Sequence, residues 1–199
     1  LLRPYAGEIH LCGRDLRSLD ARRMRSLGMS FIPDDRTEKG LLPEFAAWEN
    51  ILLGSEGRAE MQRRGVVRTA AAVARARRLA KDFSIVPEDM CLPATAFSGG
   101  NQQKMVVARE MRDDTVLLVA AQPTRGLDVG ATDHIHRRIV ELRDRGAAVL
   151  LISFDLDEIL ALSDRIAVMY SGRIAAEMAN DGSVGRSRLG LLMTGLREG

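Results

Sequence analysis

The stretch TVLLVAAQPTRGLDVGA, residues 115–131, decides the fold. Residues 116–119 are apolar and predict a buried strand. A turn rich in small and polar residues follows, and ATDHIHRRIVELRDRG then places Ile135, Ile139 and Leu142 on one side of a helix that ends at Gly146. A buried strand that leads through a turn into an amphipathic helix is typical of α/β proteins with a parallel sheet.

The rest of the chain repeats this alternation. GEIHLCGRDL, MSFIP and AAVLLIS predict strands, the last of them buried, and DRIAVMYSGRIAAE predicts a hairpin that turns at Ser171-Gly172. DARRMRSLG, DLDEILALS and the region of LGLLMTG predict helices, and DDRTEKGLLPEF predicts a polar loop. Residues 46–112 carry helix signals and no strand signal. We therefore expect a mostly parallel sheet covered by helices and interrupted by a helical insert.

Composition limits the function classes. The chain has 199 residues, 46% of them apolar, and a net charge of +2 from 29 basic and 27 acidic side chains, which argues against a general nucleic-acid binder. Cys12 and Cys91 form no CxxC pair, so a reduced cytosolic protein is expected. The sequence has neither an apolar run of about 18 residues nor a signal peptide.

The segment FSGGNQQK, residues 97–104, points to an anion. Ser98 is placed to cap a helix, and two glycines follow it directly. Glycines let backbone N–H groups approach a phosphate closely, and a helix N-terminus favours negative charge. A Ser-Gly-Gly tripeptide alone also makes an ordinary turn, so the motif needs its surroundings.

Those surroundings supply a resemblance. The order SGGNQQ, apolar strand, PTRGLD and LLIS strongly resembles the ATP-binding domains of ABC transporters, over about residues 5–195. Within them it is similar to the second ATP-binding domain of the ATPases of simple-sugar and nucleoside importers. The resemblance implies the ABC ATPase form of the P-loop NTPase fold. Because no lysine stands in a GxxxxGK[ST] setting, we expect that the phosphate loop lies upstream of Leu1 and that the chain is a fragment.

The resemblance also implies binding residues. In the family the signature motif, here Ser98, Gly99, Gly100 and Gln102, binds the γ-phosphate of an ATP that the opposing domain mainly holds. Asp128, with the preceding Gly-Leu, matches the loop that crosses the dimer interface. The expected cofactors are ATP and Mg²⁺, located mainly at the partner domain's site.

Four positions depart from the family, and no catalytic residue is intact. Ala121 stands where the family has the Asp that helps to hold Mg²⁺, and Gln122 where it has the Glu that handles the attacking water. Phe154 replaces a His that senses the γ-phosphate, and Asp34 replaces the Gln of the loop after the second strand. We expect no metal site, and a domain that completes its partner's active site while its own is nearly idle.

Two alternatives remain open. An amide can orient a water, so Gln122 is compatible with a working ATPase subunit. A non-transport relative that uses the fold on nucleic acid would need a basic stripe, which a net charge of +2 does not supply.

The resemblance further implies an organisation and partners. We divide the chain into a partial ATPase core (1–45), a helical subdomain that ends in the signature motif (46–112), an ATPase core with the degenerate metal-binding strand (113–177) and a C-terminal tail helix (178–199). The expected partners are a second ATP-binding domain, upstream in the same polypeptide, the permease subunits, reached through about Phe45–Asn50, and indirectly a substrate-binding protein, with no nucleic acid. The expected place is the cytoplasmic face of the plasma membrane, and FIPDDR, PEFAAWEN and the Ala-Gln pair favour nucleosides over ribose-like sugars.

Two other clusters have simpler interpretations. His134 and His136 are two residues apart on a helix and do not share a face. Asp155, Asp157 and Glu158 stand in the first turn of a predicted helix, where acids complement the helix dipole, so we expect no metal there.

Overall fold

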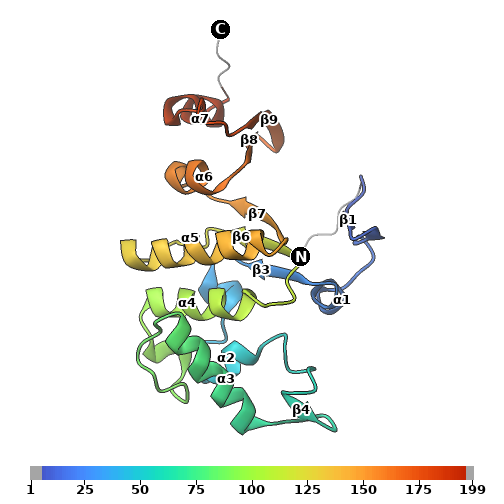
Figure 1. The fold of residues 1–199 in the computed structure, drawn as a ribbon, viewed down its shortest axis with the longest axis vertical. Coiled ribbons are helices and arrows are strands. Elements are labelled where there is room, and N and C mark those ends of the chain that lie inside the picture. The colour runs from blue at the N-terminus through green and yellow to red at the C-terminus, as the bar shows by residue number, and fades with distance from the viewer. Residues whose placement is uncertain (1–5, 196–199) are drawn as a thin grey trace. The chain divides into compact units, whose positions relative to one another are not determined.

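A computed structural model describes residues 6–195 of the chain (Figure 1). The chain divides into two compact units, Leu1–Leu150 and Leu151–Gly199. The predicted α/β class and its parallel strand pairing are confirmed in the first unit.

The first unit begins with small elements. Strands β1 (His10–Leu11) and β2 (Arg14–Asp15) pair antiparallel, so the single strand predicted here is a short hairpin. The predicted first helix is confirmed as α1 (Ala21–Ser26), whose N-cap Asp20 accepts a hydrogen bond from the backbone N–H of Arg23 at 2.7 Å. Gly28, with φ +87°, turns the chain from this helix into the sheet.

The sheet of this unit is built on one parallel pair. Strand β3 (Met29–Ile32) runs parallel to β6 (Leu117–Ala121), with Met29 opposite Leu117 and Ile32 opposite Ala120. Ser30, Ile32, Leu118 and Ala120 alternate onto a fully buried face. Because parallel strands end at the same edge, the segments that follow β3 and β6 come out side by side.

Strand β7 (Ala148–Ile152) is third in the order β3-β6-β7, and it is not the buried strand predicted. Its side chains alternate in exposure, with Leu150 at 53% and Ile152 at 49%. An apolar run predicts a strand, but it does not reveal whether one or both faces are covered.

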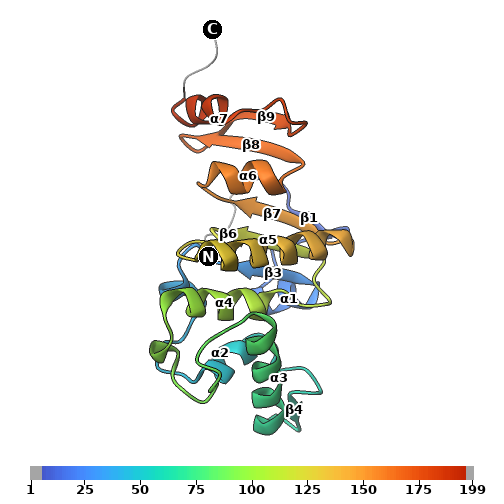
Figure 2. The ribbon, with the colours of Figure 1, turned by 60° about the vertical axis from the view of Figure 1, so that its left-hand side comes forward.

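Helices α2 (Ala47–Leu52), α3 (Thr69–Asp82) and α4 (Gly99–Glu110) pack together below the sheet in Figure 1 and Figure 2. The predicted apolar face of α3 is confirmed, since Ala72, Ala76 and Ala80 are buried. The predicted lack of strands in this region is wrong. Strands β4 (Gln62–Arg63) and β5 (Val66–Val67) form a hairpin through a turn with positive φ at Arg64 and Gly65. Two-residue strands are too short to leave a periodic signal.

Two segments connect this helical group to the sheet. The predicted polar loop after β3 contains one π-helical turn, Arg36–Gly40, whose N-cap Asp35 accepts from the N–H groups of Thr37 (2.8 Å) and Glu38 (3.0 Å). Helix α5 (Val129–Asp144) follows β6 and buries Ile135, Ile139 and Leu142, as predicted. On the same helix the ring of His134 packs edge-on against Phe83, 5.4 Å between ring centroids.

The second unit has its own core. Helix α6 (Leu156–Leu162) leads into the predicted hairpin of β8 (Arg165–Tyr170) and β9 (Arg173–Ala179), which turns at Ser171 and Gly172, both with positive φ. Helix α7 (Arg186–Met193) closes the unit. Ile166, Val168, Val184 and Leu189 are buried together. Asp155 caps α6 and accepts from the N–H of Asp157 at 2.9 Å, so these acids have a local structural role.

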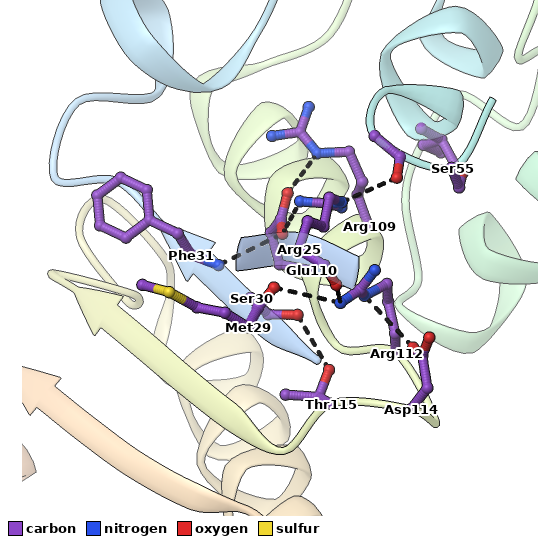
Figure 3. A network of polar contacts seen from close by, with 12 residues as sticks. Arg25, Met29, Ser30, Phe31, Ser55, Arg109, Glu110, Arg112, Asp114 and Thr115 are labelled. Carbon is purple, nitrogen blue, oxygen red and sulfur yellow. Dashed lines mark hydrogen bonds and ion pairs between the residues drawn. The ribbon is translucent and has the colours of Figure 1, made fainter. Parts of the chain in front are cut away.

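A buried carboxylate anchors the end of α4 (Figure 3). Glu110, 2% exposed, accepts from Arg25 Nη1 at 2.7 Å and from Arg109 Nε at 2.8 Å. The N–H of Phe31 in β3 lies 3.4 Å from the same carboxylate. Arg112 also joins α1 to β3, since it donates to the carbonyl groups of Arg25 in α1 (3.3 Å) and Met29 in β3 (3.2 Å). Glu110 therefore ties α4 to α1 and β3.

Replacing Glu110 by Gln should destabilise the protein, because two largely buried guanidinium groups lose their counter-charge. Breaking a buried ion pair from one side costs about 3–5 kcal/mol, so we expect a loss of about 3 kcal/mol in the free energy of unfolding. Glu141→Gln is the control, since that carboxylate is exposed and pairs with Arg138 on the surface of α5, where about 0.5 kcal/mol or less is expected. Denaturant titration of both variants measures the difference, and equal losses would contradict the anchoring role.

Candidate functional site

The start of α4 is built by Ser98. Its hydroxyl oxygen accepts from the N–H of Asn101 at 3.4 Å and from Nδ2 of Asn101 at 2.9 Å, so Ser98 is the predicted N-cap. Gly99 and Gly100 form the first helical positions, where backbone N–H groups lack partners within the helix. The end of a twelve-residue helix therefore presents donors and a positive dipole at Ser98.

Two glutamines hold this helix start in place. Gln102, which the resemblance assigns to ATP binding, donates through Nε2 to the carbonyl groups of Ala94 (3.0 Å) and Phe97 (3.1 Å). Its amide nitrogen thus stiffens the loop that enters the helix. Gln103 is 2% exposed and donates to the carbonyl of Pro123 at 2.8 Å. Sequence reasoning missed Gln103, because a Gln inside a helix carries no signal for a long-range contact.

The loop after β6 lies against the same helix start. A Cβ atom placed on Gly100 would lie 3.5 Å from the carbonyl oxygen of Gly126 and 3.7 Å from Leu127 Cδ2. Gly126 has φ +76°, a conformation that side-chain-bearing residues rarely adopt. The structure thus brings the signature motif and the PTRGLD loop together, although more than 20 residues separate them in sequence.

The structure describes both positions at which the resemblance expects an acid. Ala121 ends β6 and has no side-chain ligand atom. Gln122 has φ +51°, and its Nε2 is buried without a hydrogen-bond partner among the described residues. Backbone strain and an unpaired buried amide are both unusual for a loop residue.

Asp128 has a local structural role. Its side chain caps α5 and accepts from the N–H of Ala131 at 2.9 Å. This hydrogen bond holds the pKa of the Asp128 carboxyl below its usual value. Whether the residue also reaches a partner domain, as the resemblance implies, stays a prediction.

The other two departures differ in their surroundings. Asp34 is exposed and forms an ion pair with Lys39 at 2.8 Å, which lowers the pKa of its carboxyl. Phe154 belongs to the second unit, and its side chain is 77% exposed.

Arg36 is the site residue that sequence reasoning missed. A Cβ atom on Gly99 would lie 2.4 Å from its Nη2, and one on Gly126 would lie 3.7 Å from its Nη1. The guanidinium group therefore lies between the start of α4 and the loop after β6. Nothing in the sequence around PDDRTEKG distinguishes this arginine from its solvated neighbours.

The region predicted to meet a permease, Phe45–Asn50, divides into an exposed and a buried part. Phe45 is 49% exposed and the preceding Leu42 is 40% exposed. Asn50 is 1% exposed and accepts from the N–H of Leu42 at 2.7 Å while donating to its carbonyl at 3.0 Å. Asn50 thus shapes the turn, and residues 42–45 are the part that a partner can reach.

The described residues contain neither a candidate membrane span nor a candidate metal-binding cluster. No helix within residues 6–195 is both long enough and apolar enough to cross a bilayer. Within the same residues, His, Cys, Asp and Glu side chains nowhere gather in threes with the geometry of a metal site.

Known proteins are similar in sequence to most of this chain. The guanosine import ATP-binding protein NupO of Bacillus subtilis is 44% identical over 190 residues, which are 96% of this chain and 37% of that protein. The nucleoside import ATP-binding protein NupA of Lactococcus lactis is 39% identical over the same shares, and the ribose import ATP-binding protein RbsA 2 of Streptomyces coelicolor is 38% identical over 88% of this chain and 34% of its own length. The chain thus spans little more than a third of these relatives. No protein-family model matches it.

The solved structures define the fold. The dimeric ATP-binding cassette MJ0796, in a post-hydrolysis state bound to ADP and Pi, superposes with a TM-score of 0.74 at 21% identity, over 90% of this chain and 76% of that one. The chain therefore has the P-loop NTPase fold of an ABC ATP-binding cassette. Its sequence relatives are, more particularly, the ATP-binding proteins of nucleoside and sugar importers.

The cap at Asp128 predicts a pH-dependent contribution to stability. Because its folded pKa is lowered, the contribution is complete above the unfolded value of about 3.9 and is lost as pH falls through the folded pKa. Asp128→Asn keeps a cap without the charge, so its stability relative to the parent should be lowest above pH ~4 and should rise as the solution is acidified below that value. Denaturation midpoints between pH ~3 and ~6 measure this, and a difference that is constant with pH would contradict it.

Proposed function

We propose that this chain is an ATP-binding domain of an ABC importer for simple sugars or nucleosides, and that its signature motif completes the ATP site of an opposing domain. One contrast carries the proposal. The helix start at Ser98 is capped and held on both sides, whereas the chain's own site has an alanine in place of a metal-binding carboxylate. If the whole domain had lost its function, the signature motif and the chain's own site would both have degenerated.

The helix start fits the terminal phosphate of ATP. The Ser98 hydroxyl and the N–H groups of Gly99 and Gly100 can donate to phosphate oxygens, and the dipole of α4 favours their charge. The absence of side chains at both glycines lets the backbone approach closely. These residues would bind and orient the phosphate while the opposing domain holds the rest of the nucleotide.

The other half of the site does not fit a metal or a general base. Ala121 offers no oxygen to Mg²⁺, and Gln122 cannot accept a proton from water. A missing general base costs about 10²- to 10⁴-fold in rate. We therefore place Mg²⁺ and hydrolysis mainly at the partner domain's site and propose no step at Ala121.

The remaining details are part of the same proposal. The relative that is 44% identical is named for guanosine import, which favours nucleosides over sugars. The opposing ATP-binding domain would lie upstream in the same polypeptide, so that this chain would be the second of the two. A permease would meet about Phe45–Asn50, where the side chain of Phe45 is exposed. The assembly would work at the cytoplasmic face of the plasma membrane with a substrate-binding protein. Residues 1–45, 46–112, 113–177 and 178–199 remain the proposed functional segments.

A second function has one observation in its favour. The buried, unpartnered Nε2 of Gln122 could hold a water or a phosphate oxygen, as expected in a working ATPase that positions water through an amide. The two functions differ in what the removal of this amide should do.

A pair of variants separates them. In the full transporter, Ser98→Arg places a bulky side chain where the opposing phosphate should sit, so ATPase activity and uptake should both fall by at least about 100-fold. Gln122→Ala removes a side chain from an idle site and should change turnover only a few-fold. ATPase rate and substrate uptake are measured for both in reconstituted membranes. If Gln122→Ala is as damaging as Ser98→Arg, Gln122 is catalytic and the working-ATPase function replaces ours.

The 199-residue chain tests the idle site directly. Purified by itself, it should bind Mg-ATP weakly and show no turnover above background, because it has no lysine in a GxxxxGK[ST] setting, no metal-binding carboxylate at Ala121 and no base at Gln122. A phosphate-release assay provides the measurement. Robust hydrolysis that survives Ser98→Arg would contradict the proposed division of labour.

A further inference from the structure

Arg36 occupies the junction of three segments that are distant in sequence. It begins the π-helical turn that follows β3, and Asp35 caps that turn. The end of its side chain reaches the first residue of α4, where Nη2 fills the space that a Cβ of Gly99 would need. Nη1 lies beside Gly126 in the loop after β6.

The neighbouring charges do not account for this position. The Asp34 carboxylate is paired with Lys39 at 2.8 Å, and the Asp35 carboxylate accepts from backbone N–H groups of its own turn. Arg36 Nε is buried and has no hydrogen-bond partner among the residues that the structure describes. The guanidinium group is therefore held by packing against two glycine backbones rather than by an ion pair.

We propose that Arg36 is a positioning residue, whose planar guanidinium group sets the start of α4 against the loop after β6. This inference rests on the proposed function, in which both segments face an ATP held by the opposing domain. A flat group between Gly99 and Gly126 fixes the separation of Ser98 from the PTRGLD loop, and its charge lies beside the helix start that receives phosphate. It also gives position 99 a reason to be glycine that is independent of the nucleotide.

Removal of the guanidinium group should impair turnover more than nucleotide binding. In the full transporter, Arg36→Ala should lower the ATPase kcat by about tenfold or more, because misplacement of a binding group by about 1 Å is enough for such a loss. The KM for ATP should stay within about threefold, because the opposing domain holds most of the nucleotide. Arg36→Lys should not restore the rate, because an ammonium group keeps the charge but lacks the flat fork that spans two glycines.

A double-mutant cycle tests whether Arg36 acts through Gly99. The Cβ of Gly99→Ala would collide with the end of the Arg36 side chain, which is flexible enough to move away. Gly99→Ala should therefore mimic Arg36→Ala, and in the Arg36→Ala background it should cost clearly less than it does alone. A purely structural role would instead lower the thermal midpoint and leave the two effects on kcat additive.

Controls separate this inference from the proposed function. Arg77→Ala, on the exposed face of α3, should leave kcat within about twofold of the parent. Suppose that Ser98→Arg abolishes activity. The positioning role is then overturned, and the proposed function stands, if Arg36→Ala stays within about twofold of the parent, if Arg36→Lys restores the rate, or if the cycle is additive. If Ser98→Arg leaves activity intact, both fail. If Arg36→Ala does not fold, the kcat of Gly99→Ala decides, and a value at the parental level overturns the role.

Discussion

The structure of the first unit depends on how α4 is held, first at its last residue and then at Gln103. At its last residue the Glu110 carboxylate binds Arg25 and Arg109 and lies near the N–H of Phe31. A buried carboxylate is costly unless its oxygens are satisfied, so this end of the helix has one position relative to β3. Twelve residues earlier, about 18 Å along a straight helix, Ser98 caps the start of the same element. The candidate phosphate-binding end is thus placed by charges at the opposite end.

The middle of α4 sets the second constraint. Gln103 donates to the carbonyl of Pro123 from a buried position, which joins the helix to the loop that leaves β6. Parallel pairing of β3 with β6 brings the turn of Arg36 to the same edge of the sheet. The site is therefore a meeting of two strand ends and one helix start. A partner domain would meet these three segments as one surface.

The contacts that place α4 do not depend on an acid at Ala121 or Gln122. In the proposed function, Ala121 and Gln122 leave the chain's own site without catalysis, while the backbone of β6 and its loop stays in place. The contacts of Gln103 and of Gly126 with α4 involve no acid. A degenerate site can therefore persist beside a well-ordered signature motif, which in the proposed function serves the opposing nucleotide.

Local patterns in the sequence were enough to predict much of this unit. Ser98 as a cap, the apolar side of α5 and the strand predicted at 116–119, which is observed as Leu117–Ala121, follow from helix and strand periodicity and from capping chemistry, which act over a few residues. The hairpin of β4 and β5 and the exposure of β7 were mispredicted, because short strands and open faces leave no clear pattern.

The tertiary structure alone decided the long-range contacts. Arg36 lies 63 positions from Gly99 and 90 from Gly126 in the numbering, and no periodicity relates them. The same holds for Gln103 with Pro123 and for Glu110 with Arg25. Hydrogen bonds and packing depend on separation in space, which folding sets through the whole sheet and helix arrangement. Residue identity and local pattern determined that a cap, a strand and a turn would form. Only the folded chain determined that they would meet at one arginine.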